Sequence, residues 1–186
     1  HIQMPKLRGL IEDRKARIRK AEQSLGLIKA NGNNATITVG KHKFNSLADM
    51  ADFIKDYNKK TKEIEDRARN NDGHNEKREL DIVVGNIPFV VTSRITSGIR
   101  NRDGSLFTET SRIMTYSSDT LGLESVPVKQ GYLKNALTDI LENVMSGKDF
   151  KEAIERDTIA NERDMANLKT LSERDGKPFE FAAELK

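Results

Sequence analysis

The residue types that usually carry out chemistry are few in this chain and widely spaced. There are three His and no Cys, so a thiolate metal site and a disulfide framework are excluded. Neither His42 nor His74 has a second His at the spacing of a zinc motif. The chain also lacks a phosphate-binding glycine loop, a dinucleotide fingerprint and a nucleophile elbow. We therefore expect no catalytic residue, no metal site and no cofactor.

An enzyme remains a third hypothesis, behind two kinds of binding function given below. It would need a concave polar site built from residues such as Asp81, Glu109 and Arg112. The turn at residues 101–104 begins like a calcium-binding loop, but the downstream ligands of such a loop are missing. No motif in the sequence brings these polar residues together.

Cations near the start of the chain form the first candidate binding surface. Residues 1–30 hold eight Lys/Arg and three Asp/Glu, a net charge of +5. Residues 148–186 hold eight Lys/Arg and ten Asp/Glu, a net charge of −2. A cationic helix can contact nucleic-acid phosphates, but it can equally be a solvated face or pair with the acidic residues 149–164. The candidate contacts are Arg14, Lys15, Arg17, Arg19 and Lys20.

Arg14 is unusual because it falls inside the apolar stripe of the helix expected at residues 5–29. An arginine at such a position is either a partly buried ion pair that sets the register of two helices, or a sign that the stripe ends there. The sequence leaves both alternatives open.

A second candidate surface consists of arginines on a predicted β-meander. A two-stranded ribbon that carries arginine can enter a DNA groove or follow its backbone, although arginines on a solvated strand face are also common. Only Phe107 and Tyr116 lie among these arginines, so a platform for base stacking is weakly indicated. The candidate contacts are Arg94, Arg100, Arg102 and Arg112.

The elements that would position these cations follow from hydrophobic periodicity and turn residues. Pro88 predicts that its strand is an edge strand or begins with a bulge, because proline cannot donate to a ladder. We expect helices at 5–29, 46–69, 132–145 and 150–174, with a last helix starting near Pro178. We expect hairpins at 35–44 and 80–91, a third meander strand at 105–118, and a loop from 118 to 130.

These elements predict an α+β fold. A small, mostly antiparallel sheet of five strands would be covered by the helices at 46–69 and 132–145, while the long N- and C-terminal helices pair outside that layer. The parts would be an N-terminal helix (1–30), an α+β core (31–147) and a C-terminal helical segment (148–186), together one unit of a larger protein. No apolar run approaches the ~18 residues of a membrane span, and no signal peptide is visible, so we expect no membrane partner and a cytoplasmic location.

Several short motifs lie in a characteristic order along the chain. They are residues 36–44 with the capped helix that follows, Tyr116, Leu121-Gly122, Asn135-Ala136-Leu137, Gly176-Lys177-Pro178-Phe179-Glu180 and Glu184-Leu185. Together these motifs resemble the C-terminal region of large helicase–DNA methylase proteins of phages and conjugative elements. The resemblance implies that the whole protein acts on DNA by Swi/Snf-like ATP hydrolysis and adenine methylation, and that this chain is an accessory part without the catalytic motifs.

Two hypotheses follow. In the first, the chain is a non-catalytic accessory domain of a DNA-processing protein and contacts DNA through the two sets of cations. In the second, it is a protein–protein interaction or scaffold module with no nucleic-acid contact. Its helical hairpin would then dock onto other domains of the whole protein or form a homodimer with a second copy.

Overall fold

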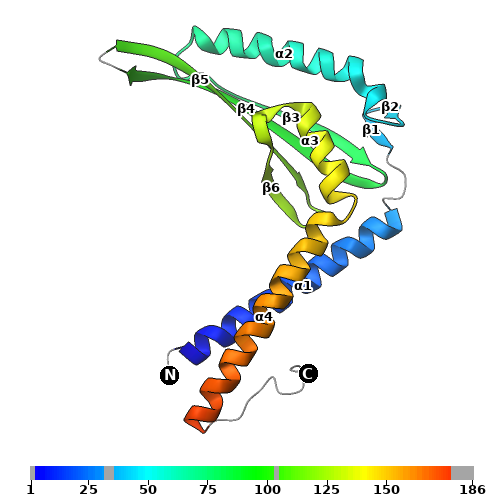
Figure 1. Ribbon diagram of the computed structural model, residues 1–186. Coiled ribbons are helices and arrows are strands. Elements are labelled where there is room, and N and C mark those ends of the chain that lie inside the picture. Colours follow the sequence, from blue (N-terminus) through cyan, green and yellow to red (C-terminus); the bar gives the residue numbers. More distant parts are fainter. Residues whose placement is uncertain (1–2, 32–35, 103–104, 177–186) are drawn as a thin grey trace. The chain divides into compact units, whose positions relative to one another are not determined.

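The computed structural model describes residues 3–31, 36–102 and 105–176, and for residues 100–102 and 105–107 it describes the backbone alone (Figure 1). The chain divides into two compact units. The helical unit consists of the residues up to Gly26 and from Gly147 onward, and the sheet unit runs from Leu27 to Ser146. No described helix is long and apolar enough to cross a membrane.

The sheet unit contains one six-stranded antiparallel sheet with the strand order β2-β1-β3-β4-β5-β6. The strands are β1 (Ile37–Val39), β2 (His42–Phe44), β3 (Asn75–Val84), β4 (Ile87–Arg102), β5 (Ser105–Ser118) and β6 (Leu123–Pro127). The other elements are the short helices η1 (Ala48–Met50) and η2 (Lys129–Gly131), helices α2 (Ala51–Arg69) and α3 (Leu133–Asp139), and a π-helical turn, η3 (Ile140–Val144). The expected α+β class is confirmed.

Helices α2 and α3 cover one face of the sheet, as expected from their apolar stripes, and Figure 1 shows α2 lying along β4 and β5. Side chains alternate between the two faces of a strand, so every second residue of β4 points to this covered face. Phe89 packs edge-on against Tyr116 there, with 6.4 Å between ring centroids. The buried residues are Ile87, Phe89, Val91 and Ile95 of β4, Ile54, Tyr57 and Ile64 of α2, and Leu133, Ala136 and Leu137 of α3.

Pro88 lies in β4, which is a central strand, so the prediction of an edge strand is wrong. Val84 and Ile87 close the two-residue hairpin between β3 and β4 and form a hydrogen-bonded pair. In an antiparallel pair the next residue, Pro88, therefore has its backbone nitrogen pointing away from β3. On that outer side the ladder with β5 begins only at Val90. Proline is tolerated because its position precedes the ladder it would interrupt.

Two further strand limits differ from the sequence analysis. Strand β6 occupies part of the expected loop, because it is only five residues long, ends in Pro127 and pairs with β5 through an irregular register, with Ser125 at φ 39°. Strand β3 begins at Asn75 and not at Leu80, since its charged first half also pairs with β4. Arg78, in that half, covers the Tyr57 ring at 4.0 Å and donates a 2.6 Å hydrogen bond to Thr61 of α2. A charged side chain thus occupies a position that faces the core.

The helical unit is an antiparallel pair formed by α1 (Gln3–Asn31) and α4 (Lys148–Asp175), which confirms the expected pairing of the long terminal helices. Near one end of the pair Leu25 lies against Gly147, and at the other Met4 and Ile11 pack against Met165 and Leu168. The last helix expected near Pro178 lies outside the described residues.

Candidate nucleic-acid interface

Arg14 forms a partly buried ion pair with Asp164 of α4, and the two side chains are only 14% and 6% exposed. Burial alone would raise the pKa of Asp164. The hydrogen bonds from Arg14 and from Arg163 (3.2 Å) outweigh burial and hold the pKa below its usual value. Of the two alternatives that the sequence left open for Arg14, the structure shows the ion pair between helices.

Arg17 makes a second link between the two helices. Its Nε donates to Oδ2 of Asp157 at 3.0 Å and its Nη2 donates to Oδ1 at 3.3 Å, a bidentate geometry. The hydrogen bond from Arg17 lowers the pKa of Asp157. Two of the five cations in the first candidate surface are therefore engaged with α4.

The other three cations of this set face outward to different degrees. Lys15 is partly buried and lies 3.7 Å from Glu12, one turn earlier in α1. Arg19 and Lys20 are exposed, and neither forms an ion pair with the described part of the chain. Arg17 is also exposed at its surface, with 57% of its side chain accessible, but its guanidinium is bonded to Asp157.

The meander arginines do not form one surface. Arg112 lies on the covered face of the sheet, where it bonds Glu65 of α2 at 2.8 Å and stacks over the Tyr132 ring at 4.3 Å. Arg94 lies on the opposite face, exposed, and donates a 2.7 Å hydrogen bond to Asn75. The backbones of Arg100 and Arg102 pair with Phe107 and Ser105, while their side chains lie outside the described residues.

The face that carries Arg94 holds a feature that the sequence analysis missed. Among the described residues of this face, Lys77, Asp81, Arg94 and Ile113 are exposed. Lys77 of β3 stands directly opposite Arg94, and we call these two exposed residues the cationic pair. Like charges directly opposite each other in a sheet are destabilising. Glu79 partly neutralises this charge, at 2.7 Å from the Lys77 ammonium.

Hydroxyl side chains flank the cationic pair on the neighbouring register positions. Thr92 and Thr96 precede and follow Arg94 on the same face of β4, and each pairs with a hydroxyl residue of β5. These partners are Thr115 and Ser111, respectively. In the sequence, the alternation of Thr92, Arg94 and Thr96 within residues 92–97 could have indicated that these three side chains share one face of the strand. Lys77 could not be placed beside it, because β3 was expected to begin three residues later.

The residues named for an enzyme are not brought together. Asp81 is exposed on the face that carries Arg94 and pairs with Val90, whereas Glu109 pairs with Gly98, about 26 Å further along β4 at the usual rise per residue. Arg112 lies on the other face.

A polar pocket of about 450 Å³ beside α3 contains Asp139, whose carboxylate accepts hydrogen bonds from Tyr116 and Asn143. Within the described ranges no three His, Asp or Glu side chains are grouped to hold a metal ion.

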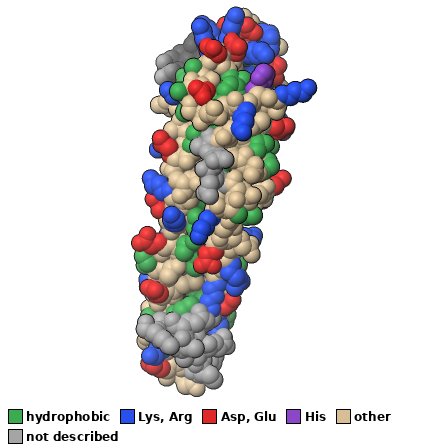
Figure 2. All heavy atoms as spheres, turned by 90° about the vertical axis from the view of Figure 1, so that its right-hand side faces the viewer, with side chains coloured by type: hydrophobic (Ala, Val, Ile, Leu, Met, Phe, Trp, Pro, Cys, Tyr) green, Lys and Arg blue, Asp and Glu red, His purple; other side chains and the backbone are tan. Residues whose placement is uncertain are grey.

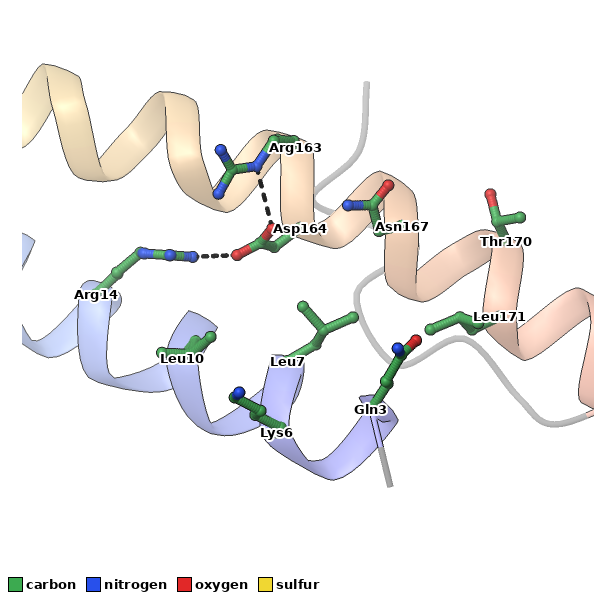
Figure 3. Close-up of a pocket in the computed structure, with 10 residues that line it drawn as sticks. All are labelled: Gln3, Lys6, Leu7, Leu10, Arg14, Arg163, Asp164, Asn167, Thr170 and Leu171. Carbon is green, nitrogen blue, oxygen red and sulfur yellow. Dashed lines mark hydrogen bonds and ion pairs between the residues drawn. The ribbon is translucent and has the colours of Figure 1, made fainter. Parts of the chain in front are cut away.

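A second candidate site is a groove in the helical unit, between the first half of α1 and the second half of α4 (Figure 3). Its volume is about 570 Å³. Leu10, one of the residues that line it, is 38% exposed.

Comparison with protein-family models, with curated proteins and with solved structures finds no match. The interpretation of both sites therefore depends on the physical properties of the residues themselves.

Proposed function

We propose that this chain is a non-catalytic accessory module of a DNA-processing protein and that its sheet unit contacts nucleic-acid phosphates through the cationic pair. The observation that carries the proposal is Lys77 directly opposite Arg94 on an exposed sheet face, flanked by hydroxyl side chains. Lys, Arg, Ser and Thr are among the side chains that most often bind phosphate oxygens. The resemblance to helicase–DNA methylase proteins supports a DNA-processing role, and such a role would be cytoplasmic.

The proposal assigns different tasks to the other cations. Arg14 and Arg17 hold α4, and releasing either one would leave a carboxylate of that helix without its partner. Arg112 joins β5 to α2 through Glu65. Arg19 and Lys20 are exposed members of the first candidate surface that form no ion pair with the described residues, and we expect them to add a weaker contact.

The test is fluorescence anisotropy with labelled single- and double-stranded DNA at low and at physiological salt. We expect the Lys77→Glu/Arg94→Glu variant to weaken binding and to reduce the log–log salt slope by about two units, one for each phosphate that the variant no longer binds. A matched control is Lys55→Glu/Lys59→Glu, which makes the same charge change on exposed positions of α2.

The control variant is expected to keep most of the salt slope. Equal losses of affinity in the two variants would show that only net charge matters and would overturn the role of the cationic pair. No binding by the unaltered protein at low salt would overturn nucleic-acid contact altogether.

The second candidate function, a protein interaction module, is favoured by the groove in the helical unit and by the exposure of Leu10. If the partner is a second copy, light scattering would show a dimer that dissociates in a Leu10→Glu variant. A monomer at high concentration would leave docking onto other domains of the same protein as the form of this function.

A further inference from the structure

The floor of the groove is apolar. It includes Leu7 and Leu10 of α1 and Leu171 of α4, and Figure 3 shows them between the two helices. Leu7 and Leu171 also pack against the buried cluster formed by Met4, Ile11, Met165 and Leu168. The groove is therefore continuous with the core of the helical unit, and its occupant would extend that core.

The rim of the groove is cationic. Lys6 is exposed on the α1 side, and the Arg163 side chain on the α4 side is 66% exposed. Asp164 is the one carboxylate among the residues that line the groove, and it is already bonded to Arg14 and Arg163. This combination of an apolar floor and a cationic rim suits a segment that carries both large apolar side chains and carboxylates.

We propose that the groove binds residues 177–186 of the same chain. This segment lies outside the described residues, and its sequence, Lys-Pro-Phe-Glu-Phe-Ala-Ala-Glu-Leu-Lys, has the required composition. Phe179, Phe181 and Leu185 can cover the apolar floor. Glu180 and Glu184 can pair with the cations of the rim.

The end of α4 places this segment close to the groove. Gly176 ends the helix in the left-handed conformation, with φ 67°, and its N–H bonds back to Glu173, an arrangement after which a chain usually changes direction. Along α4 the groove extends from Leu171 to Arg163, about 12 Å at the helical rise. Ten residues span up to about 33 Å when extended, so residues 177–186 are long enough to reach all of it.

The test uses the absence of natural Cys from the full chain. A Leu10→Cys/Phe181→Cys variant is expected to form a disulfide within one chain, detected by mass spectrometry after mild oxidation at low protein concentration. Docking raises the effective concentration of one thiol near the other, so the rate should exceed that of an undocked pair by at least about tenfold.

The matched control is Glu12→Cys/Phe181→Cys. Glu12 is exposed and only two residues from Leu10, but it points away from the groove at 100° per residue, and the loop to be closed is almost the same length. Equal rates in the two variants would overturn the proposal. Disulfides that join two chains in preference to one would identify a second copy as the occupant and would also overturn it.

A charge test gives an independent answer. In the background of the Leu10→Cys/Phe181→Cys variant, Glu180→Lys/Glu184→Lys should slow the disulfide reaction several-fold, and adding Lys6→Glu/Arg163→Glu should restore most of the rate. Slowing without restoration would show that the rim does not recognise the two glutamates.

Discussion

Arg14 illustrates how a single cation can belong to a binding surface or to a core. Its position in an apolar stripe is visible in the sequence, but the sequence does not show which carboxylate meets it. The structure supplies Asp164, a residue 150 positions away, and both side chains are largely buried. A charge held in this way stabilises the register of α1 against α4 and has little left to offer a ligand.

Removing the carboxylate charge should therefore destabilise the helical unit. We expect Asp164→Asn to lower the free energy of unfolding by about 3 kcal/mol, because Arg14 would keep a poorly solvated charge. Urea unfolding at neutral pH measures this change. The control is Glu162→Gln on the exposed side of the same helix, with an expected effect of at most about 0.5 kcal/mol. A similar loss of stability in both variants would contradict the structural role of the ion pair.

The same carboxylates should make stability depend on pH. The pKa values of Asp157 and Asp164 are lower in the folded chain than their usual values, so the unfolded state binds more protons in acid. Their contribution is present above about pH 4 and is lost as pH falls through the folded-state pKa values. The midpoint of urea unfolding should drop over this range. The midpoint should drop less in an Asp157→Asn/Asp164→Asn variant. If the variant and the unaltered protein show the same pH dependence, other groups cause the drop.

At the scale of elements, the junction before α4 depends on one glycine. Gly147 has φ 80°, a backbone conformation that favours glycine. A Cβ added there would also lie 2.8 Å from the terminal Cδ2 of Leu25, so that the leucine side chain would have to shift.

Two glycine-to-alanine changes should consequently have opposite effects. Gly147→Ala should reduce stability by about 1–3 kcal/mol through strain and overlap with Leu25. Gly9→Ala, in an open position within α1, should increase stability by about 0.5–1 kcal/mol through helix propensity. Thermal unfolding of the two variants checks the signs, and a loss of stability at both positions would mean that the space around Gly9 is not open.

The elements also explain which features were predictable. Helices α1, α2, α3 and α4 and the hairpin around Gly85 were expected from periodicity and turn residues, whereas η2 lies mostly in the expected loop. The first half of β3 is charged, and the short strand β6 contains an irregular register and Pro127, so neither shows a clear local pattern. Their conformation depends on pairing with neighbouring strands. The missed half of β3 contains Lys77, so the cationic pair was missed with it.

At the scale of the whole molecule, charge of both signs is interspersed. The net charge is +3, and Figure 2 shows cations and anions side by side over the face in view. A surface of this kind gives weak long-range attraction to a polyanion, so any nucleic-acid contact must be local.

We therefore expect DNA affinity to depend only moderately on salt. A few phosphate contacts correspond to a log–log slope of about −2 to −4, measured by anisotropy over a series of salt concentrations. A slope near −8 would require a broad basic surface and would contradict the small set of exposed cations proposed as contacts.

Local sequence patterns were sufficient to predict the α+β class and the helices that cover the sheet, because periodicity and turn chemistry act over a few residues. Which cations remain accessible depends on the folded chain. Arg14, Arg17 and Arg112 link separate elements through Asp164, Asp157 and Glu65, whereas Lys77 and Arg94 lie opposite each other on one exposed sheet face, with Glu79 and Asn75 as their partners. The reason is physical: the partner of a charged side chain is set by helix packing and strand register, which join residues far apart in the chain.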